Sequence, residues 1–208
     1  MDLARLRRRG LRRRRAPHGT GLPAVPWLED PPAADGRKVV VTDTDHYAPG
    51  RGDALWAWKS FLRGHHPILM DFGLVGGVNP PDPSAGGPMS YAAFEPARWA
   101  MGDTRRFAEQ VDLIQMEPRV DLASTAYALA NPGQEYLVLQ PRGAADPFTV
   151  TLEPGTYTAE WFAIEGRQTV PGAATTVHRP MATSFSPPPE ASGPTVLYLK
   201  KVTDRGRG

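Results

Sequence analysis

Two short apolar runs on either side of a helical segment constrain most strongly what this chain can fold into. The first run is VVV, residues 39–41, and the second is PILM, residues 67–70. Neither run alternates with polar residues, which is typical of strands buried on both faces in a parallel sheet. Between them, Asp53 suits a helix N-cap and Gly64 suits a helix end. The order strand, helix, strand predicts a βαβ unit with parallel strands and a right-handed crossover.

Acidic and polar residues follow both apolar runs. Asp43, Asp45, His46 and Tyr47 come after the first run, and Asp71 ends the second. The carboxyl ends of parallel strands meet at one edge of the sheet, where ligands of such sheets bind, so we expect these residues to share one rim. Asp43 and Asp45 lie on the same face if the strand continues. The alternative is that the aspartates cap a loop through backbone hydrogen bonds.

The same cluster could be read as a metal site, because Asp43, Asp45 and His46 are side chains that bind divalent metals. Strand alternation, however, turns His46 away from the two aspartates. His65 and His66 precede the second apolar run and therefore lie at its other end, far from the acidic rim. The sequence predicts neither a metal site nor a cofactor.

A long loop and a second helix follow the βαβ unit. Residues 72–94 are rich in glycine and proline, and loops of this length in a compact domain are often functional. Pro96 suits the first turn of a helix. The apolar stripe expected for that helix consists of Ala100, Phe107, Val111 and Ile114.

From residue 119 onward the pattern changes to short β segments separated by Gly/Pro turns. The expected strands include residues 136–139, 148–152, 157–161 and 195–200. The expected turns are Asn131-Pro132-Gly133, Arg142-Gly143, Glu153-Pro154-Gly155 and Pro171-Gly172. Strands at this spacing predict an antiparallel β-sandwich over residues 119–201, with a short tail at 202–208.

The first 37 residues differ from the rest in charge and composition. Residues 1–15 contain eight of the chain's 24 basic residues and one of its 22 acidic ones, so they carry +7 and the remainder carries −5. Residues 16–37 are rich in proline, glycine and alanine without periodicity. We expect residues 1–37 to be a disordered tail. The alternatives are an arm for acidic partners and upstream sequence translated from a misplaced start.

Four stretches together carry a resemblance to a known family. They are VVVTDTDHY, WAWKSFLRGHHPILMD, ARWAMGDTRRFAEQVDL and DLASTAYALANPGQEYLVLQP. In this order they resemble the C-terminal part of a family of bacterial glycoside hydrolase-like (β/α)₈-barrel proteins. That family carries a C-terminal β-sandwich labelled as a collagen-binding domain of a collagenase. The resemblance covers about residues 38–201.

The resemblance implies a fold that is α/β plus all-β. Residues 38–118 would be the remnant of a TIM-type barrel, namely its last two βα units, and residues 119–201 would be the β-sandwich. A barrel needs eight strands and typically ~250 residues, and residues 38–118 supply only two strands. The resemblance also implies that Asp43 or Asp45 is a catalytic carboxylate in an intact parent protein. His46, Tyr47 and Asp71 would then bind substrate.

Two functions follow as hypotheses. The first is a C-terminal fragment of a glycoside hydrolase-like protein, inactive alone because glycoside hydrolysis usually needs two carboxylates on opposite sides of the bond. The second is a free-standing module that binds a polysaccharide or a matrix protein such as collagen. Neither involves nucleic acid or a membrane, and the sequence does not fix the oligomeric state. The parent would be an exported protein. We also expect residues 119–201 to fold on their own.

Overall fold

A computed structural model describes residues 29–43, 53–71, 91–143 and 146–203. Of the predicted rim residues, Asp43 and Asp71 lie in these ranges, whereas Asp45, His46 and Tyr47 lie outside them. No helix in the described part is long and apolar enough to cross a membrane.

The first half of the chain contains two parallel strands and two helices. The bounds are β1 Val40–Asp43, α2 Ala54–Leu62, β2 His65–Ile68, η1 Ala92–Phe94, α4 Glu95–Gln110 and η2 Leu113–Gln115. Strand β1 pairs with β2 in parallel, with Val41 opposite His66 and Asp43 opposite Ile68. Asp53 caps α2 by accepting a hydrogen bond from the Trp56 N–H at 2.8 Å. The predicted parallel pairing and the predicted cap are therefore confirmed.

Three details of this half differ from the prediction. Strand β2 begins at His65, two residues before the apolar run, because His65 pairs with Val40 of β1, and its ring is buried and hydrogen-bonded. Helix α4 ends before Val111, and Ile114 is 92% exposed, so Ile114 does not belong to the apolar stripe. The expected burial of both strand faces is also wrong, since Val39 is 77% and Val41 55% exposed.

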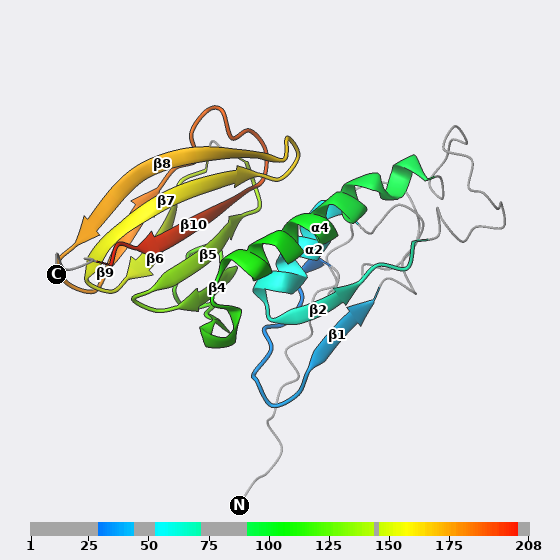
Figure 1. The fold of residues 1–208 in the computed structure, drawn as a ribbon, viewed down its shortest axis with the longest axis horizontal. Helices are drawn as coiled ribbons and strands as arrows, with labels where there is room; N and C mark the ends of the chain where they lie inside the picture. The colour runs from blue at the N-terminus through cyan, green and yellow to red at the C-terminus, as the bar shows by residue number, and fades with distance from the viewer. Residues whose placement is uncertain (1–28, 44–52, 72–90, 144–145, 204–208) are drawn as a thin grey trace, which may run out of the picture.

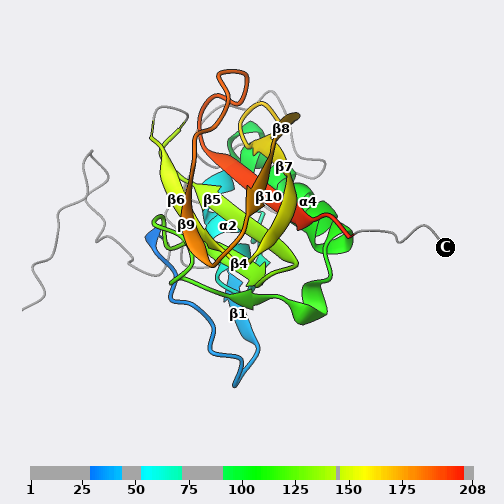
Figure 2. The same cartoon turned by 90° about the vertical axis from the view of Figure 1, so that its left-hand side faces the viewer.

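The second half forms antiparallel sheets, as predicted. The strands are β3 Glu117–Pro118, β4 Ala128–Asn131, β5 Glu135–Gln140, β6 Phe148–Leu152, β7 Gly155–Ala163, β8 Gln168–Val177, β9 Met181–Phe185 and β10 Thr195–Lys201. Six of them form one sheet in the order β3-β4-β5-β10-β7-β8, while β6 and β9 form a second, two-stranded sheet. Figure 2 shows β6 and β9 beside the larger sheet, with α2 and α4 beyond it. We call residues 119–201 the β-region.

Helices α2 and α4 lie between the parallel strands and the six-stranded sheet (Figure 1). Trp58 of α2 and Phe107 of α4 both contact Phe162 of β7, with ring centroids 5.7 and 5.5 Å apart. The β-region contributes Tyr127, Leu129, Leu137, Leu139, Phe162, Ile164, Val196 and Tyr198 to this core. The core is thus shared between the helices and the sheet, and every residue of β5 is buried.

A second core fills the space between the two antiparallel sheets. Strands β6 and β9 contribute Phe148, Val150, Leu152 and Phe185 to it. Trp161 faces this core and explains why Pro171-Gly172, predicted as a turn, lies inside β8. A Cβ on Gly172 would sit 3.0 Å from Nε1 of Trp161 and 2.9 Å from Cβ of Ala159. The glycine is required by close packing of a side chain and marks no turn.

Residues 29–34 pack against the rest of the molecule, so the expectation that structure begins at Lys38 is wrong. The carboxylate of Asp30 accepts hydrogen bonds from the hydroxyl of Tyr127 at 2.7 Å and from Nη2 of Arg63 at 3.0 Å. The Ala34 N–H donates to the carbonyl oxygen of Arg63 at 2.8 Å. This segment ties the end of α2 to the β-region.

Candidate functional site

The described acidic residues of the predicted rim lie at the carboxyl ends of β1 and β2. Asp43 is the last residue of β1, and Asp71 follows β2 by three positions. Because the strands run in parallel, both residues lie at the same end of the two-stranded sheet. The predicted rim is therefore confirmed for these two aspartates, and its other three members lie outside the described residues.

Asp71 is held by an arginine that the sequence did not single out. Nη1 of Arg98, on α4, lies 2.7 Å from Oδ2 of Asp71, and both side chains are largely buried. The same guanidinium donates to the carbonyl oxygen of Tyr91 and lies 3.8 Å from the centre of the Tyr91 ring. Arg98 thereby joins the residues on either side of positions 72–90. Partly buried arginine–carboxylate pairs of this kind fix geometry.

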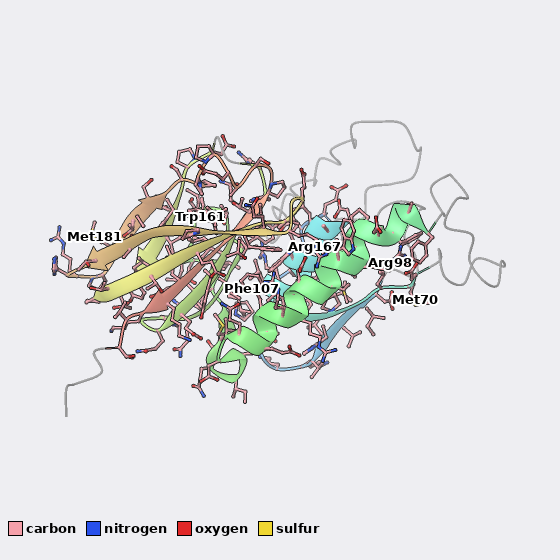
Figure 3. The ribbon with its side chains drawn as sticks, turned by 45° about the horizontal axis from the view of Figure 1, so that its top comes forward. Met70, Arg98, Phe107, Trp161, Arg167 and Met181 are labelled. Atoms are coloured by element: carbon pink, nitrogen blue, oxygen red, sulfur yellow. The ribbon has the colours of Figure 1, made fainter. Side chains whose placement is uncertain are left out.

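Only one oxygen of Asp71 is used in this contact. Its Oδ1 is buried and forms no hydrogen bond with the described part of the chain. A buried carboxylate oxygen without a donor is costly to the folded state. Figure 3 shows Arg98 and Met70 close together at this end of the molecule.

One face of the β1–β2 sheet is exposed and mostly apolar. Strand alternation and the pairing register place Val39, Val41, Asp43, His66, Ile68 and Met70 on that face. Its apolar members are all more than a third exposed. The opposite face carries Thr42 and His65, both buried on the helix side. Asp43 therefore extends from the exposed face, away from the helices.

His65 and His66 lie at the amino end of β2, opposite the acidic rim, as predicted. Nε2 of His65 donates to the carbonyl oxygen of Pro32 at 2.7 Å, so Nδ1 accepts from the Thr42 hydroxyl at 2.8 Å. Both ring nitrogens of the neutral histidine are thus satisfied. Burial lowers the pKa of His65 below its ordinary 6.5. These contacts indicate a structural histidine.

The burial of His65 predicts a loss of stability in mild acid. The unfolded chain takes up the proton near pH 6.5 while the folded chain resists it, so the contribution of His65 is complete above pH 6.5 and falls as pH drops below it. The slope is at most about 1.4 kcal/mol per pH unit. Urea unfolding at a series of pH values measures it. A His65→Gln variant with the same slope between pH 7.5 and 5.5 would contradict the assignment.

A cleft lies at the amino ends of the strands and not at the acidic rim. It has a volume of 870 Å³ and runs between β2 and α4. Its apolar lining includes Phe61, Met101, Leu113 and Met116. Among the described residues, no group of three or more His, Cys, Asp or Glu side chains could hold a metal ion.

Two ionic clusters join α4 and its C-terminal end to the β-region, and neither was predicted. Asp103 of α4 is buried and accepts hydrogen bonds from Nε and Nη2 of Arg167, between β7 and β8, at 2.9 and 3.1 Å. A second ion pair links Asp103 to Arg106. Arg167 adopts a positive φ of 51°, which the paired contact helps to hold.

The second cluster surrounds Glu135 of β5. Its Oε1 accepts from Nζ of Lys200 at 2.8 Å and from the Tyr198 hydroxyl at 2.9 Å, and its Oε2 accepts from the Asp112 N–H at 2.9 Å. Burial opposes ionisation of Glu135, but these donors outweigh it, so the pKa of Glu135 lies below its ordinary value. The sequence offers one sign of this role, a charged residue directly before the apolar run of β5.

Comparisons with known proteins give a fold relationship only. No protein-family model and no curated protein sequence matches the chain. A solved structure described as a glycoside hydrolase is similar with a TM-score of 0.57 and 15% identity, over 84% of this chain and 45% of that protein. A glycoside hydrolase family 5 protein from Bacteroides vulgatus ATCC 8482 is similar with a TM-score of 0.55 and 13% identity, over 74% of this chain and 36% of that protein. The chain thus spans less than half the length of either protein.

Proposed function

We propose that this chain is the C-terminal part of a glycoside hydrolase-like protein that acts on a carbohydrate. Residues 38–118 would form the last two βα units of a (β/α)₈ barrel, and the β-region would be its accessory sandwich. The fold similarity to two glycoside hydrolases supports the proposal, since it extends over most of this chain but less than half of theirs.

One observation carries the proposal. The β1–β2 sheet is parallel, its helices cover a single face, and the other face is apolar and exposed. In a (β/α)₈ barrel the helices cover the outside of the strands, and the inward face is buried by side chains of the other strands. Val41 and Ile68 would then point into the barrel. Asp43, on the same face at the carboxyl end, would lie where barrel enzymes bind substrate.

We propose that the acidic and polar residues predicted at this rim carry out the catalysis and contact the sugar. Asp43 or Asp45 would supply one of the two carboxylates that glycoside hydrolysis needs, while His46, Tyr47 and Asp71 would take part in binding the sugar. For Asp71 the contribution would be indirect, because its carboxylate is largely buried and pairs with Arg98. The second carboxylate would come from a strand on the opposite side of the barrel.

The β-region supports a bracing role better than a binding role. All eight of its aromatic side chains are buried, so no exposed ring is offered to a polysaccharide. Two of its side chains, Arg167 and Glu135, instead bond to α4 and to the segment that follows it. We therefore propose that the β-region holds the last barrel helices in place. No residue of the described part supports recognition of collagen.

The test compares the 208-residue chain with a longer protein that includes the six preceding βα units of the same gene. Each is assayed on aryl glycosides and on plant and bacterial polysaccharides. We expect no hydrolysis by the chain and turnover by the longer protein, because only the latter presents two carboxylates to one bond. Turnover by the chain alone would overturn the proposal, as would a preceding sequence that encodes no βα units.

A further inference from the structure

Arg98 of α4 uses one guanidinium to join two places that are distant in the sequence. Its Nη1 donates to Oδ2 of Asp71 at 2.7 Å, and its Nη2 donates to the carbonyl oxygen of Tyr91. The guanidinium carbon also lies 3.8 Å from the centre of the Tyr91 ring. Asp71 follows β2, and Tyr91 precedes η1 and α4. Arg98 therefore holds the two residues that bound positions 72–90.

Burial strengthens the contact between Arg98 and Asp71. The side chain of Arg98 is 19% exposed and that of Asp71 is 12% exposed. Solvent screens such a pair less than a surface pair, and removal of one partner leaves a buried charge without compensation. Arg105 of the same helix gives the contrast, because its ion pair with Glu109 is exposed, at 81% and 65%. Exposed pairs of that kind contribute little to stability.

The place of Arg98 on α4 is not explained by the stability of the helix. Helix α4 begins at Glu95, so Arg98 lies close to its N-terminal end. A positive charge there opposes the helix macrodipole, which favours anions at this end. The contacts that Arg98 makes outside the helix account for its position instead. Arginine suits these contacts, because its planar group carries several donors and stacks on an aromatic ring, whereas lysine carries a single ammonium.

We propose that Arg98 is a positioning residue of the acidic rim, which fixes the distance between Asp71 and Tyr91. Asp71 lies at the same end of the two-stranded sheet as Asp43, so its position sets one boundary of the rim. In folds with parallel strands, the segments that follow the carboxyl ends of the strands bind the ligand. Arg98 determines where the segment between β2 and α4 leaves the rim and where it returns.

The consequence for catalysis rests on the proposed function. Both Nη atoms of Arg98 already donate to the protein, so Arg98 acts through the residues that it holds. Loss of a group that positions binding residues without touching the reacting atoms weakens substrate binding more than it slows the chemical step. In a longer protein that contains the preceding βα units, loss of Arg98 should therefore raise KM more than it lowers kcat.

The first experiment uses the 208-residue chain and depends on no activity. The chain contains no cysteine, so cysteines introduced at Ile68 and Ala92 can carry a pair of spin labels. Both positions are exposed and lie within three residues of Asp71 or Tyr91. Pulsed electron paramagnetic resonance measures the distribution of distances between the labels. We expect a narrow distribution, which Arg98→Ala should broaden at least about twofold, because the buried pair is lost.

Two further variants keep this measurement decisive. Arg98→Lys leaves a positive charge beside Asp71 and should fold, but it should also broaden the distribution, because one ammonium does not replace two donors and the ring contact. Arg105→Ala is the matched control and should leave the distribution unchanged. A folded Arg98→Ala chain with an unchanged distribution would overturn the proposal, and Arg98→Lys decides in the same way if Arg98→Ala does not fold. Equal broadening by Arg105→Ala would also overturn it.

The second experiment measures steady-state hydrolysis by the longer protein. Arg98→Lys should raise KM at least about tenfold and change kcat less than about threefold, whereas Arg105→Ala should change neither. An unchanged KM, or a fall in kcat larger than the rise in KM, would contradict the positioning role. If the longer protein hydrolyses no glycoside, the proposed function fails, and the label distances alone decide whether Arg98 fixes the rim.

Discussion

Residues 119–201 expressed alone should fail to give a cooperatively folded protein. The six-stranded sheet is buried on both sides, by β6 and β9 on one and by α2 and α4 on the other. Removing the helices would expose eight core side chains of the β-region. At about 1.5–3 kcal/mol for each apolar side chain, the loss is roughly 10 kcal/mol or more. That is comparable with the whole stability of a domain.

Lost polar contacts add to this expected effect. Glu135 would lose the Asp112 N–H, Arg167 would lose Asp103, and the Tyr127 hydroxyl would lose Asp30. Thermal unfolding followed by circular dichroism, together with binding of a hydrophobic dye, measures the outcome. We expect no sharp transition and strong dye binding for residues 119–201, and a single transition for residues 29–203.

Co-expression with residues 29–118 is the control, since the helices supplied in trans should restore a cooperative transition. If residues 119–201 melt cooperatively within a few degrees of the longer protein, the shared core contributes little and the expectation fails. The result would also distinguish two expectations. The pattern of turns and strands predicts that residues 119–201 fold on their own as a β-sandwich, whereas the shared core predicts that they do not.

The sequence predicts the βαβ unit correctly because its signals are local. Asp53 caps a helix through its own neighbours, and the two apolar runs favour extended backbone wherever they lie. Burial of a strand face depends on which layers are present, and no local signal carries that information. For this reason Val39 and Val41 are exposed although their run predicts burial.

The β-region shows the opposite case, in which the sequence itself carries a signal of burial on both strand faces. The run EYLVLQ of β5 and the run TVLYL of β10 do not alternate, and all of their residues are buried. Such runs are typical of strands buried on both faces. Here one face packs against β6 and β9, and the other packs against helices α2 and α4. The turn predicted at Pro171-Gly172 is wrong for a different reason. Gly172 lies within a strand and is small because the Trp161 ring packs against it.

For the candidate site, the sequence predicts only which residues lie at the ends of the strands. Parallel pairing places Asp43 and Asp71 at one end, which follows from the topology alone. The pairing of Asp71 with Arg98 could not be predicted, because the two residues are 27 positions apart and meet only through the packing of α4 on the sheet. The same holds for Asp103 and Arg167, which are 64 positions apart.

Asp43→Asn and Asp45→Asn, made separately in the longer protein with its preceding βα units, should each test the catalytic assignment. The residue that acts as nucleophile or as general acid–base should lose about 10²–10⁴-fold in kcat, because the amide can neither transfer a proton nor attack the sugar. Asn keeps the size and most of the hydrogen bonding of Asp, so the fold should be preserved. Steady-state hydrolysis of an aryl glycoside measures the effect.

Asp35→Asn is the matched control for these substitutions. Asp35 lines the cleft at the amino ends of the strands, away from the acidic rim, so the same chemical change there should leave kcat unaltered. Asp71→Asn separates positioning from chemistry, because it weakens the ion pair with Arg98 and should lower the melting temperature and raise KM more than it lowers kcat. If neither Asp43→Asn nor Asp45→Asn lowers kcat by more than Asp35→Asn does, the two aspartates only cap the loop after β1. The catalytic carboxylates of the longer protein would then both have to come from other strands.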